Sequence, residues 1–200
     1  MRAYTRTFTA SSRCRKRRDR DPAPSFHPLG KFNLIGLRPP IAAQRSEIGH
    51  LEGDLIVGAY NKSAIATVFD RCSRHVWLAH LPGSKRADPT FEALVKTLNR
   101  IPQQFRLTLT WDQGSEMARH RELAEQCGID IYFTDPKSPW QRPTNENGNG
   151  LIRRYVGKHT DLSIYTPKQL STIEHRINTI PRRIHNWATA QDIYNQQLTR

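Results

Sequence analysis

Most of the chain consists of short segments in which apolar residues recur at a fixed spacing. Over residues 51–57 apolar side chains lie on one face of a period-two segment, with Glu52 and Asp54 on the other face. Short apolar segments follow at residues 67–69 and 76–78, and a polar turn separates them. This spacing predicts a three-stranded antiparallel meander.

Helical and strand spacing alternate after the meander. Apolar residues at helical intervals predict a helix that starts with Asp88 as its cap and Pro89 as its first residue, and a second helix that stops at Gly128. Strands are predicted at residues 107–111 and 129–133, one after each helix. A capping box beginning at residue 166 then starts a helix with an apolar stripe.

This order of elements predicts an α/β fold of the ribonuclease-H-like type, with a five-stranded mixed sheet flanked by helices. A chain of 200 residues suits one domain with a sizeable core. We assign the core domain to residues 46–195 and treat residues 1–45 separately.

Residues 1–45 differ in composition from the rest of the chain. Six of the eight residues from Arg13 to Arg20 are basic, and several prolines follow. Such a segment has too little apolar surface to form a core, so we expect a disordered basic tail. The alternative is a folded DNA-binding module.

Charge is distributed unevenly along the chain, which carries a net charge of +13. Residues 1–50 and 137–200 have net charges of +8 and +6, whereas residues 51–136 have a net charge of −1. Basic regions on both sides of a near-neutral middle favour a polyanionic partner, namely DNA.

Composition also bears on where the protein works. The three cysteines show no metal-ligand spacing, as is typical of a reduced compartment. Neither an apolar run long enough to cross a membrane nor a signal peptide is recognisable. We therefore expect a cytoplasmic protein that acts on neither a membrane nor a small-molecule substrate.

Three carboxylates carry the candidate chemistry. Asp54 lies in the first predicted strand, Asp112 ends the fourth, and Glu146 starts a predicted helix, with 33 residues between the last two. Carboxylate oxygens suit Mg²⁺, and two such ions roughly 3.5–4 Å apart can hold both the attacking and leaving oxygens of a phosphoryl transfer. Each acid alone also has a structural explanation: a solvated strand residue, a turn former, or a first-turn helix acid.

Basic and polar residues surround the third acid. In a helix from Glu146, Asn149 and Arg153 lie on the same face as the acid. The alternative is a solvated basic helix face. Our candidates for nucleic-acid contacts are Lys137, Arg142, Asn149, Arg153, Arg154 and Lys158.

Two further residues affect the loop before Glu146. Trp140 either packs under that loop or stacks on a DNA base, and the general burial preference of tryptophan favours packing. Gly148 and Gly150 weaken the helix start by about 1 kcal/mol each relative to alanine, so we expect mobility without metal or DNA.

Four sequence blocks contain the three acids or lie close to them. They read GHLEGDLI at 49–56, TWDQGSEM at 110–117, SPWQR at 138–142 and TNEN at 144–147. Together they resemble the signature blocks of the insertion-sequence-30 transposases, a family with a DDE core of the retroviral-integrase type. The resemblance covers roughly residues 38–190.

The resemblance implies a function and a set of site residues. Asp54, Asp112 and Glu146 become the catalytic, metal-binding triad for two Mg²⁺ or Mn²⁺ ions. Such an enzyme binds the terminal repeats of its element, hydrolyses a phosphodiester, and joins the released 3′-hydroxyl to target DNA. The family also implies homo-oligomers on DNA.

The chain departs from its family in two respects. About 45 residues precede the core and contain no helix-turn-helix pattern, so we expect an N-terminally truncated copy. Pro143 stands where the family often has glycine, and it fixes the backbone close to Glu146. The alternative function is a transposition-incompetent remnant that binds DNA nonspecifically or modulates a full-length transposase; a generic nuclease of the same fold is disfavoured.

Overall fold

A computed structural model describes residues 29–81 and 86–199 of the chain. Its centre is a six-stranded mixed sheet with the strand order β1-β6-β5-β2-β3-β4. The strands β1, β6, β5 and β2 are mutually parallel, and β3 and β4 complete an antiparallel meander with β2. The strands are β1 (Asn33–Leu34), β2 (His50–Val57), β3 (Ala64–Asp70), β4 (Val76–Leu81), β5 (Thr108–Trp111) and β6 (Asp130–Phe133).

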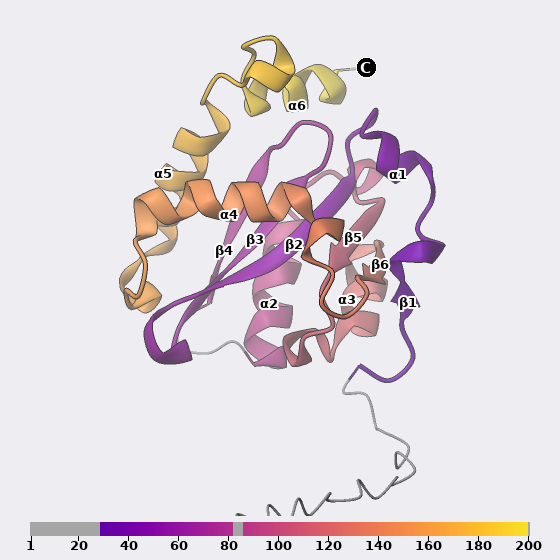
Figure 1. Cartoon of the computed structure of the whole chain (residues 1–200), viewed down its shortest axis with the longest axis vertical. Helices are drawn as coiled ribbons and strands as arrows, with labels where there is room; N and C mark the ends of the chain where they lie inside the picture. Colours follow the sequence, from indigo (N-terminus) through magenta and orange to yellow (C-terminus); the bar gives the residue numbers. More distant parts are fainter. Residues whose placement is uncertain (1–28, 82–85, 200) are drawn as a thin grey trace, which may run out of the picture.

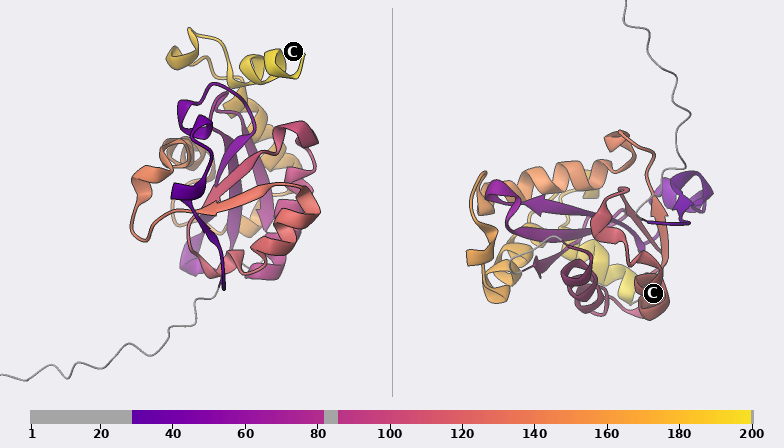
Figure 2. Two further views of the ribbon diagram at one scale, coloured as in Figure 1. Left: turned by 90° about the vertical axis from the view of Figure 1, so that its right-hand side faces the viewer. Right: turned by 90° about the horizontal axis from the view of Figure 1, so that it is seen from below.

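Helices cover both faces of the sheet (Figures 1 and 2). The helices α2 and α3 pack on one face, and α4 and α5 pack on the other. The helix α6 adds Tyr194 to the first of these two cores. The helices are α1 (Ile41–Gln44), α2 (Ala87–Leu98), α3 (His120–Cys127), α4 (Pro143–Val156), α5 (Pro167–Asn178) and α6 (Ala190–Leu198).

The alternation of side chains along the strands explains the two cores. In β3, Ala66 and Val68 face α2, whereas Ile65 and Phe69 face α4 and α5. Successive residues of a strand point to opposite faces, so a strand covered on both sides is apolar at nearly every position. The predicted ribonuclease-H-like α/β class and the meander are thus confirmed.

The sheet has one strand more than the five expected. The additional strand is β1, which pairs with the outer edge of β6 through Asn33 and Leu34. A two-residue strand carries no periodic signal, and it forms because the edge of β6 offers unpaired backbone groups.

The segment ahead of the predicted core domain is partly described. From residue 29 it contributes the buried side chains of Leu29 and Ala42, and the carbonyl of Ala42 accepts a hydrogen bond from Arg71 Nε at 3.0 Å. Packing on the core therefore extends N-terminal of the expected boundary at residue 46. The basic run from Arg13 to Arg20 lies outside the described residues.

Helix boundaries follow local signals closely. The helix α3 ends at Gly128 in the left-handed conformation, with φ of 62°, and α5 begins with the expected capping box at Thr166. The helix α2 starts at Ala87 without a side-chain cap, so the predicted capping role of Asp88 is wrong. The helix α4 starts at Pro143, because proline suits the first position of a helix.

Gly148 is a point of close approach between α4 and the sheet. A Cβ atom built on Gly148 would lie 2.1 Å from Cζ of Phe69, which is 1% exposed on β3. The same atom built on Gly150 would meet nothing within 4 Å. Gly148 therefore sets the distance between α4 and β3, whereas Gly150 has no packing role.

Across the described ranges, no helix is both long and apolar enough to span a bilayer.

We predict opposite effects on stability for two glycine substitutions in α4. Gly148→Ala should lower the free energy of unfolding by about 1–3 kcal/mol, because the added methyl overlaps the Phe69 ring. Gly150→Ala, the matched control, should raise it by roughly 0.5–1 kcal/mol, since alanine favours the helix and meets no neighbour. Urea unfolding measures both, and equal stabilisation by both variants would contradict the close contact.

Candidate active site

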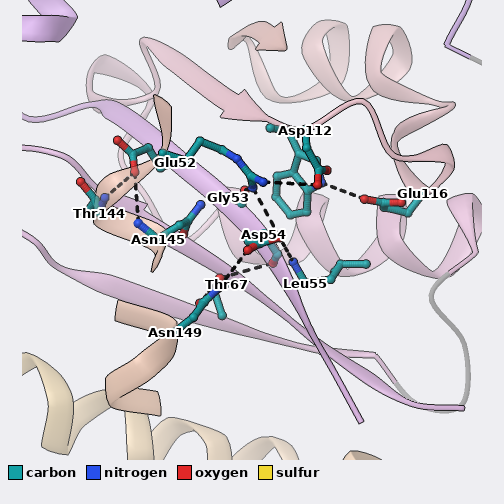
Figure 3. Close-up of polar contacts among 12 residues, drawn as sticks. Glu52, Gly53, Asp54, Leu55, Thr67, Asp112, Glu116, Thr144, Asn145 and Asn149 are labelled. Carbon is teal, nitrogen blue, oxygen red and sulfur yellow. Dashed lines mark hydrogen bonds and ion pairs between the residues drawn. The ribbon is translucent and has the colours of Figure 1, made fainter. Parts of the chain in front are cut away.

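Asp54 and Asp112 lie side by side on adjacent parallel strands. The register pairs Glu52 of β2 with Thr110 of β5, and two further residues along each strand bring Asp54 level with Asp112. Side chains at the same level of neighbouring parallel strands point to the same face. Figure 3 shows both carboxylates converging on one region beside β2.

A guanidinium group lies between the two aspartates. Arg142 Nη1 is 3.4 Å from Asp54 Oδ1, and Arg142 Nη2 is 3.3 Å from Asp112 Oδ2. Arg142 Nη1 also donates to the carbonyl of Gly53 at 2.8 Å. Arg142 thus holds the two carboxylates together and offsets their mutual repulsion.

Glu146 occupies the first turn of α4 and is exposed. It lies one turn before Asn149, whose Nδ2 donates to Asp54 Oδ2 at 2.9 Å. Residues three apart share a helix face, so Glu146 faces the side of α4 that meets Asp54. Over the residues that the structure describes, however, no set of three or more acidic, histidine or cysteine side chains is close enough to hold a metal ion.

The position of α4 is fixed by a fourth carboxylate, which sequence analysis assigned no role. Glu52 is fully buried, and its Oε2 accepts from the backbone N–H groups of Thr144 and Asn145 at 2.8 and 3.1 Å. These N–H groups belong to the first turn of α4, where backbone N–H groups have no acceptor within the helix. Glu52 also forms a buried ion pair with Arg71. A strand residue two places before Asp54 therefore caps the helix that carries Glu146.

The carboxylate of Asp54 is oriented by its surroundings. Its Oδ1 accepts from the backbone N–H of Leu55 at 2.9 Å. Its partner Asn149 is itself held by Thr67 Oγ1, which donates to Asn149 Oδ1 at 3.1 Å. Burial raises the pKa of Asp54, and Arg142 opposes this shift by favouring the charged form.

Glu116 is a further carboxylate close to the site, although it too was assigned no role. Trp111 Nε1 donates to Glu116 Oε1 at 3.1 Å, and the indole ring packs on Gly53, where a Cβ atom would lie 2.0 Å from the ring. Burial raises the pKa of Glu116, and the charges of Asp112 and Asp54 add to that increase. Glu116 lies in the same sequence block as Asp112, and this proximity is the sequence signal that could have identified it as a site residue.

A cavity of about 430 Å³ opens beside Asp112. Lys137 and Arg142 line it, along with the segment that connects β6 to α4. Lys137 is exposed and has φ of 59°, so its backbone adopts the left-handed conformation. Of the six predicted nucleic-acid contacts, these two therefore share a cavity with an aspartate.

The other four predicted contacts lie along α4 and just beyond it. Asn149 is engaged with Asp54, and Arg153 donates to the carbonyls of Val57 and Gly157. Arg153 and Lys158 line a separate hollow of about 510 Å³. Arg154 is exposed.

Trp140 does not pack under the loop before Glu146. Its side chain is 69% exposed, in the short 3-10 helix Pro139–Gln141. The packing interpretation is therefore wrong. It failed because general burial preferences describe tryptophans in a core, whereas this residue lies in a connection at the surface.

The donor set suits a hard divalent cation. Asp112 Oδ1 is buried and has no hydrogen-bond partner among the described residues, so it is an acceptor without a donor. Such an oxygen, next to a second carboxylate, matches the ligand preference of Mg²⁺ and Mn²⁺. The Arg142 guanidinium shows that this position already accommodates positive charge.

Comparison with known proteins agrees with the fold. A family model described as integrase core domain matches residues 44–139. In a cryo-electron microscopy structure of the simian T-cell lymphotropic virus intasome with PP2A regulatory subunit B56 gamma, one chain superposes with a TM-score of 0.57 at 17% identity. The match covers 72% of this chain and 54% of that chain, and it shows the fold alone. The molecule is therefore an integrase-core protein of ribonuclease-H-like fold.

Three curated relatives identify a family within this class. The transposase for IS1086 of Cupriavidus metallidurans is 44% identical over 164 residues, which are 82% of this chain and 48% of that protein. Transposase InsI for IS30A of Escherichia coli is 44% identical over 149 residues, 74% of this chain and 38% of that protein. The IS4351 transposase of Bacteroides fragilis is 38% identical over 162 residues, 81% of this chain and 49% of that protein.

The chain belongs to the IS30 family of transposases. It spans about half, or less, of the length of these curated relatives. Integrases and transposases of this kind generally use divalent metal ions.

We predict that replacing Glu116 with an uncharged residue stabilises the protein, and that this gain grows as the pH rises. The folded state binds the Glu116 proton more tightly than the unfolded state, so ionisation lowers stability as the pH rises through the range in which this carboxyl titrates. Glu116→Gln keeps an oxygen for Trp111 Nε1 but cannot ionise. Its stability relative to the unsubstituted protein should therefore increase with pH in metal-free urea unfolding. Glu125→Gln removes the same charge from an exposed position on α3 and serves as the control. A pH-independent difference for Glu116→Gln would contradict the assignment.

Proposed function

We propose that this chain is the catalytic core of a DDE transposase, with Asp54, Asp112 and Glu146 as its catalytic residues. The observation that carries the proposal is the parallel register that brings Asp54 and Asp112 together on the face of the sheet covered by α4, whose first turn carries Glu146. The enzyme would cut DNA at the terminal repeats of an insertion sequence and join the released end to target DNA. It would work in the cytoplasm as a homo-oligomer on DNA.

The three acids would hold two Mg²⁺ or Mn²⁺ ions, which supply charge for the attacking and leaving oxygens of the phosphodiester. Asp54 and Asp112 would serve as shared ligands from the sheet, while Asn149 keeps Asp54 oriented through the 2.9 Å hydrogen bond. Glu146 would complete the set from the exposed first turn of α4. The start of α4 would have to move to bring Glu146 to the two aspartates, because the described residues contain no cluster of three such acids in this structure.

DNA would lie over the cavity beside Asp112. Lys137 would contact the phosphate backbone there, because its exposed ammonium borders the cavity. The hollow with Arg153 and Lys158 supports a second backbone contact further along α4. The exposed Trp140 is available to stack on an unpaired base near the cut.

We predict that Asp112→Asn abolishes metal-dependent cleavage of labelled terminal-repeat DNA, with a loss of at least about a hundredfold. The amide keeps the shape of the side chain but removes the charge that a divalent ion requires. Asp130→Asn, at the opposite end of the neighbouring strand β6, is the matched control and should retain activity. Nicking assays with and without Mg²⁺ or Mn²⁺ measure both. Cleavage by Asp112→Asn at the unsubstituted rate, or no metal-dependent cleavage at all, would refute the proposed function.

We also predict that Arg142 and the metal compete for the same carboxylate oxygens. Arg142→Gln should lower the melting temperature without metal, because the Asp54 and Asp112 charges then repel each other. It should also bind Mg²⁺ more tightly, by roughly tenfold, and gain more thermal stability from it than the unsubstituted protein does. Calorimetry without DNA measures the affinity, and Arg154→Gln on α4 is the control. Equal Mg²⁺ affinity in all three proteins would show that Arg142 does not compete.

A further inference from the structure

A second, strongly basic cavity lies on another flank of α4. It has a volume of about 220 Å³, and three arginines from separate parts of the chain line it: Arg45 after α1, Arg74 in the turn between β3 and β4, and Arg182 after α5. Its remaining lining includes Asn147 and Leu151 of α4. None of the three acids assigned to catalysis lines this cavity.

Positive charge exceeds negative charge around this cavity. Burial lowers the pKa of Arg74, and the charges of Arg45, Arg71 and Arg182 lower it further. Glu52 is the carboxylate that acts in the opposite direction, and its own oxygens are already bound by Arg71 and the start of α4. Arg74 therefore lies near three other arginines, and the carboxylate that favours its charge is already engaged.

The three lining arginines make no ion pair with any carboxylate in the described part of the chain. Arg74 Nη1 donates to Thr144 Oγ1 at 2.6 Å, and Arg182 Nη2 donates to the carbonyl of Ile177 at 3.3 Å. Arg182 Nε is buried and has no hydrogen-bond partner among the described residues. Leaving a buried charged donor unpaired is costly, and an anion in the cavity would relieve that cost.

The remaining surface of the cavity is apolar. Phe69, Leu151 and Pro143 line it, and Ile184, which is 66% exposed, borders the opening. An arginine cluster over apolar side chains suits a phosphodiester with its attached deoxyribose, because the phosphate accepts from the guanidinium groups while the sugar covers apolar surface. A volume of about 220 Å³ corresponds to roughly seven water molecules, enough for one phosphate group.

We propose that Arg45, Arg74 and Arg182 form a binding site for one backbone phosphate of DNA, in a cavity that none of the three acids lines. This proposal rests on the proposed DNA-processing function and adds where a DNA strand is held outside the cleavage site. The site anchors the strand beside the start of α4, the helix that carries Glu146. It binds phosphate without metal, because its charge comes entirely from arginine.

The test measures affinity for a labelled mixed-sequence DNA duplex by fluorescence anisotropy, without divalent metal, over a series of salt concentrations. Arg45→Gln is the primary variant, because the described residues give its side chain no hydrogen bond to lose. Arg182→Gln is the second variant. Lys96→Gln, exposed on α2 at the opposite face of the sheet, removes the same charge as a control.

Each arginine variant should bind DNA about fivefold more weakly, and the slope of log affinity against log salt should fall by about one. The Lys96→Gln control should match the unsubstituted protein. Thermal melting and circular dichroism establish that every variant is folded. If Arg182→Gln proves unstable, Arg45→Gln alone decides the result.

Other outcomes overturn the proposal in distinguishable ways. If DNA affinity and salt slope are unchanged in both arginine variants, the phosphate site is refuted. The proposed metal-dependent cleavage is not affected by that result. Inorganic phosphate that raises the melting temperature of the unsubstituted protein but not of Arg45→Gln, with DNA affinity unchanged in that variant, would indicate a site for the free ion only. By contrast, loss of cleavage in Asp112→Asn together with the predicted arginine dependence of DNA affinity would support the phosphate site and separate it from the catalytic one.

Discussion

The buried carboxylate of Glu52 holds together the two parts of the candidate active site. It lies on β2, two residues before Asp54, and it accepts the N–H groups that begin α4. A buried charge is stable only when it is paired and fully hydrogen-bonded, and here Arg71 and two backbone donors meet that condition. Without Glu52, the start of α4 would have unpaired donors and Arg71 an unpaired buried charge, so the helix with Glu146 would lose its fixed position over the sheet.

Close backbone packing supports the same arrangement from the strands. The Trp111 ring lies directly against Gly53, so β2 and β5 are pressed together just before their aspartates. Glu116 fixes the other edge of that indole. On the far side of β2, Gly148 lets α4 lie against Phe69. Glycines at these two contacts let the elements of the candidate active site lie close together, and the Trp111 and Phe69 rings fill the space beside them.

Much of this arrangement is predictable from sequence. Alternation along residues 51–57 and 107–111 identifies the strands that carry Asp54 and Asp112, and the glycine after α3 and the capping box of α5 mark helix ends. These strands and helix ends can be predicted because strand alternation and helix caps depend only on residues that are close together in the sequence. The sheet order then brings the two aspartates together.

Other features depend on residues far apart in the chain, so local patterns do not reveal them. Glu52 has the same strand periodicity as Asp54, and only the docking of α4 distinguishes a buried cap from a solvated acid. The strand β1 has two residues and forms through its neighbour β6. The cavity with Arg45, Arg74 and Arg182 assembles from segments that sequence analysis treated separately. Trp140 was misjudged for the same reason, since its exposure depends on the path of a surface connection.

The guanidinium between Asp54 and Asp112 has a consequence for which ions can enter the site. Because Arg142 is tethered to the chain, it competes at a high effective concentration with any cation from solution. Sodium or potassium carries the same single charge as the guanidinium and lacks its tether to the chain. An ion with twice the charge interacts about twice as strongly with the same oxygens. In the proposed metal site, the arginine would therefore favour divalent ions over the abundant monovalent ions of the cell.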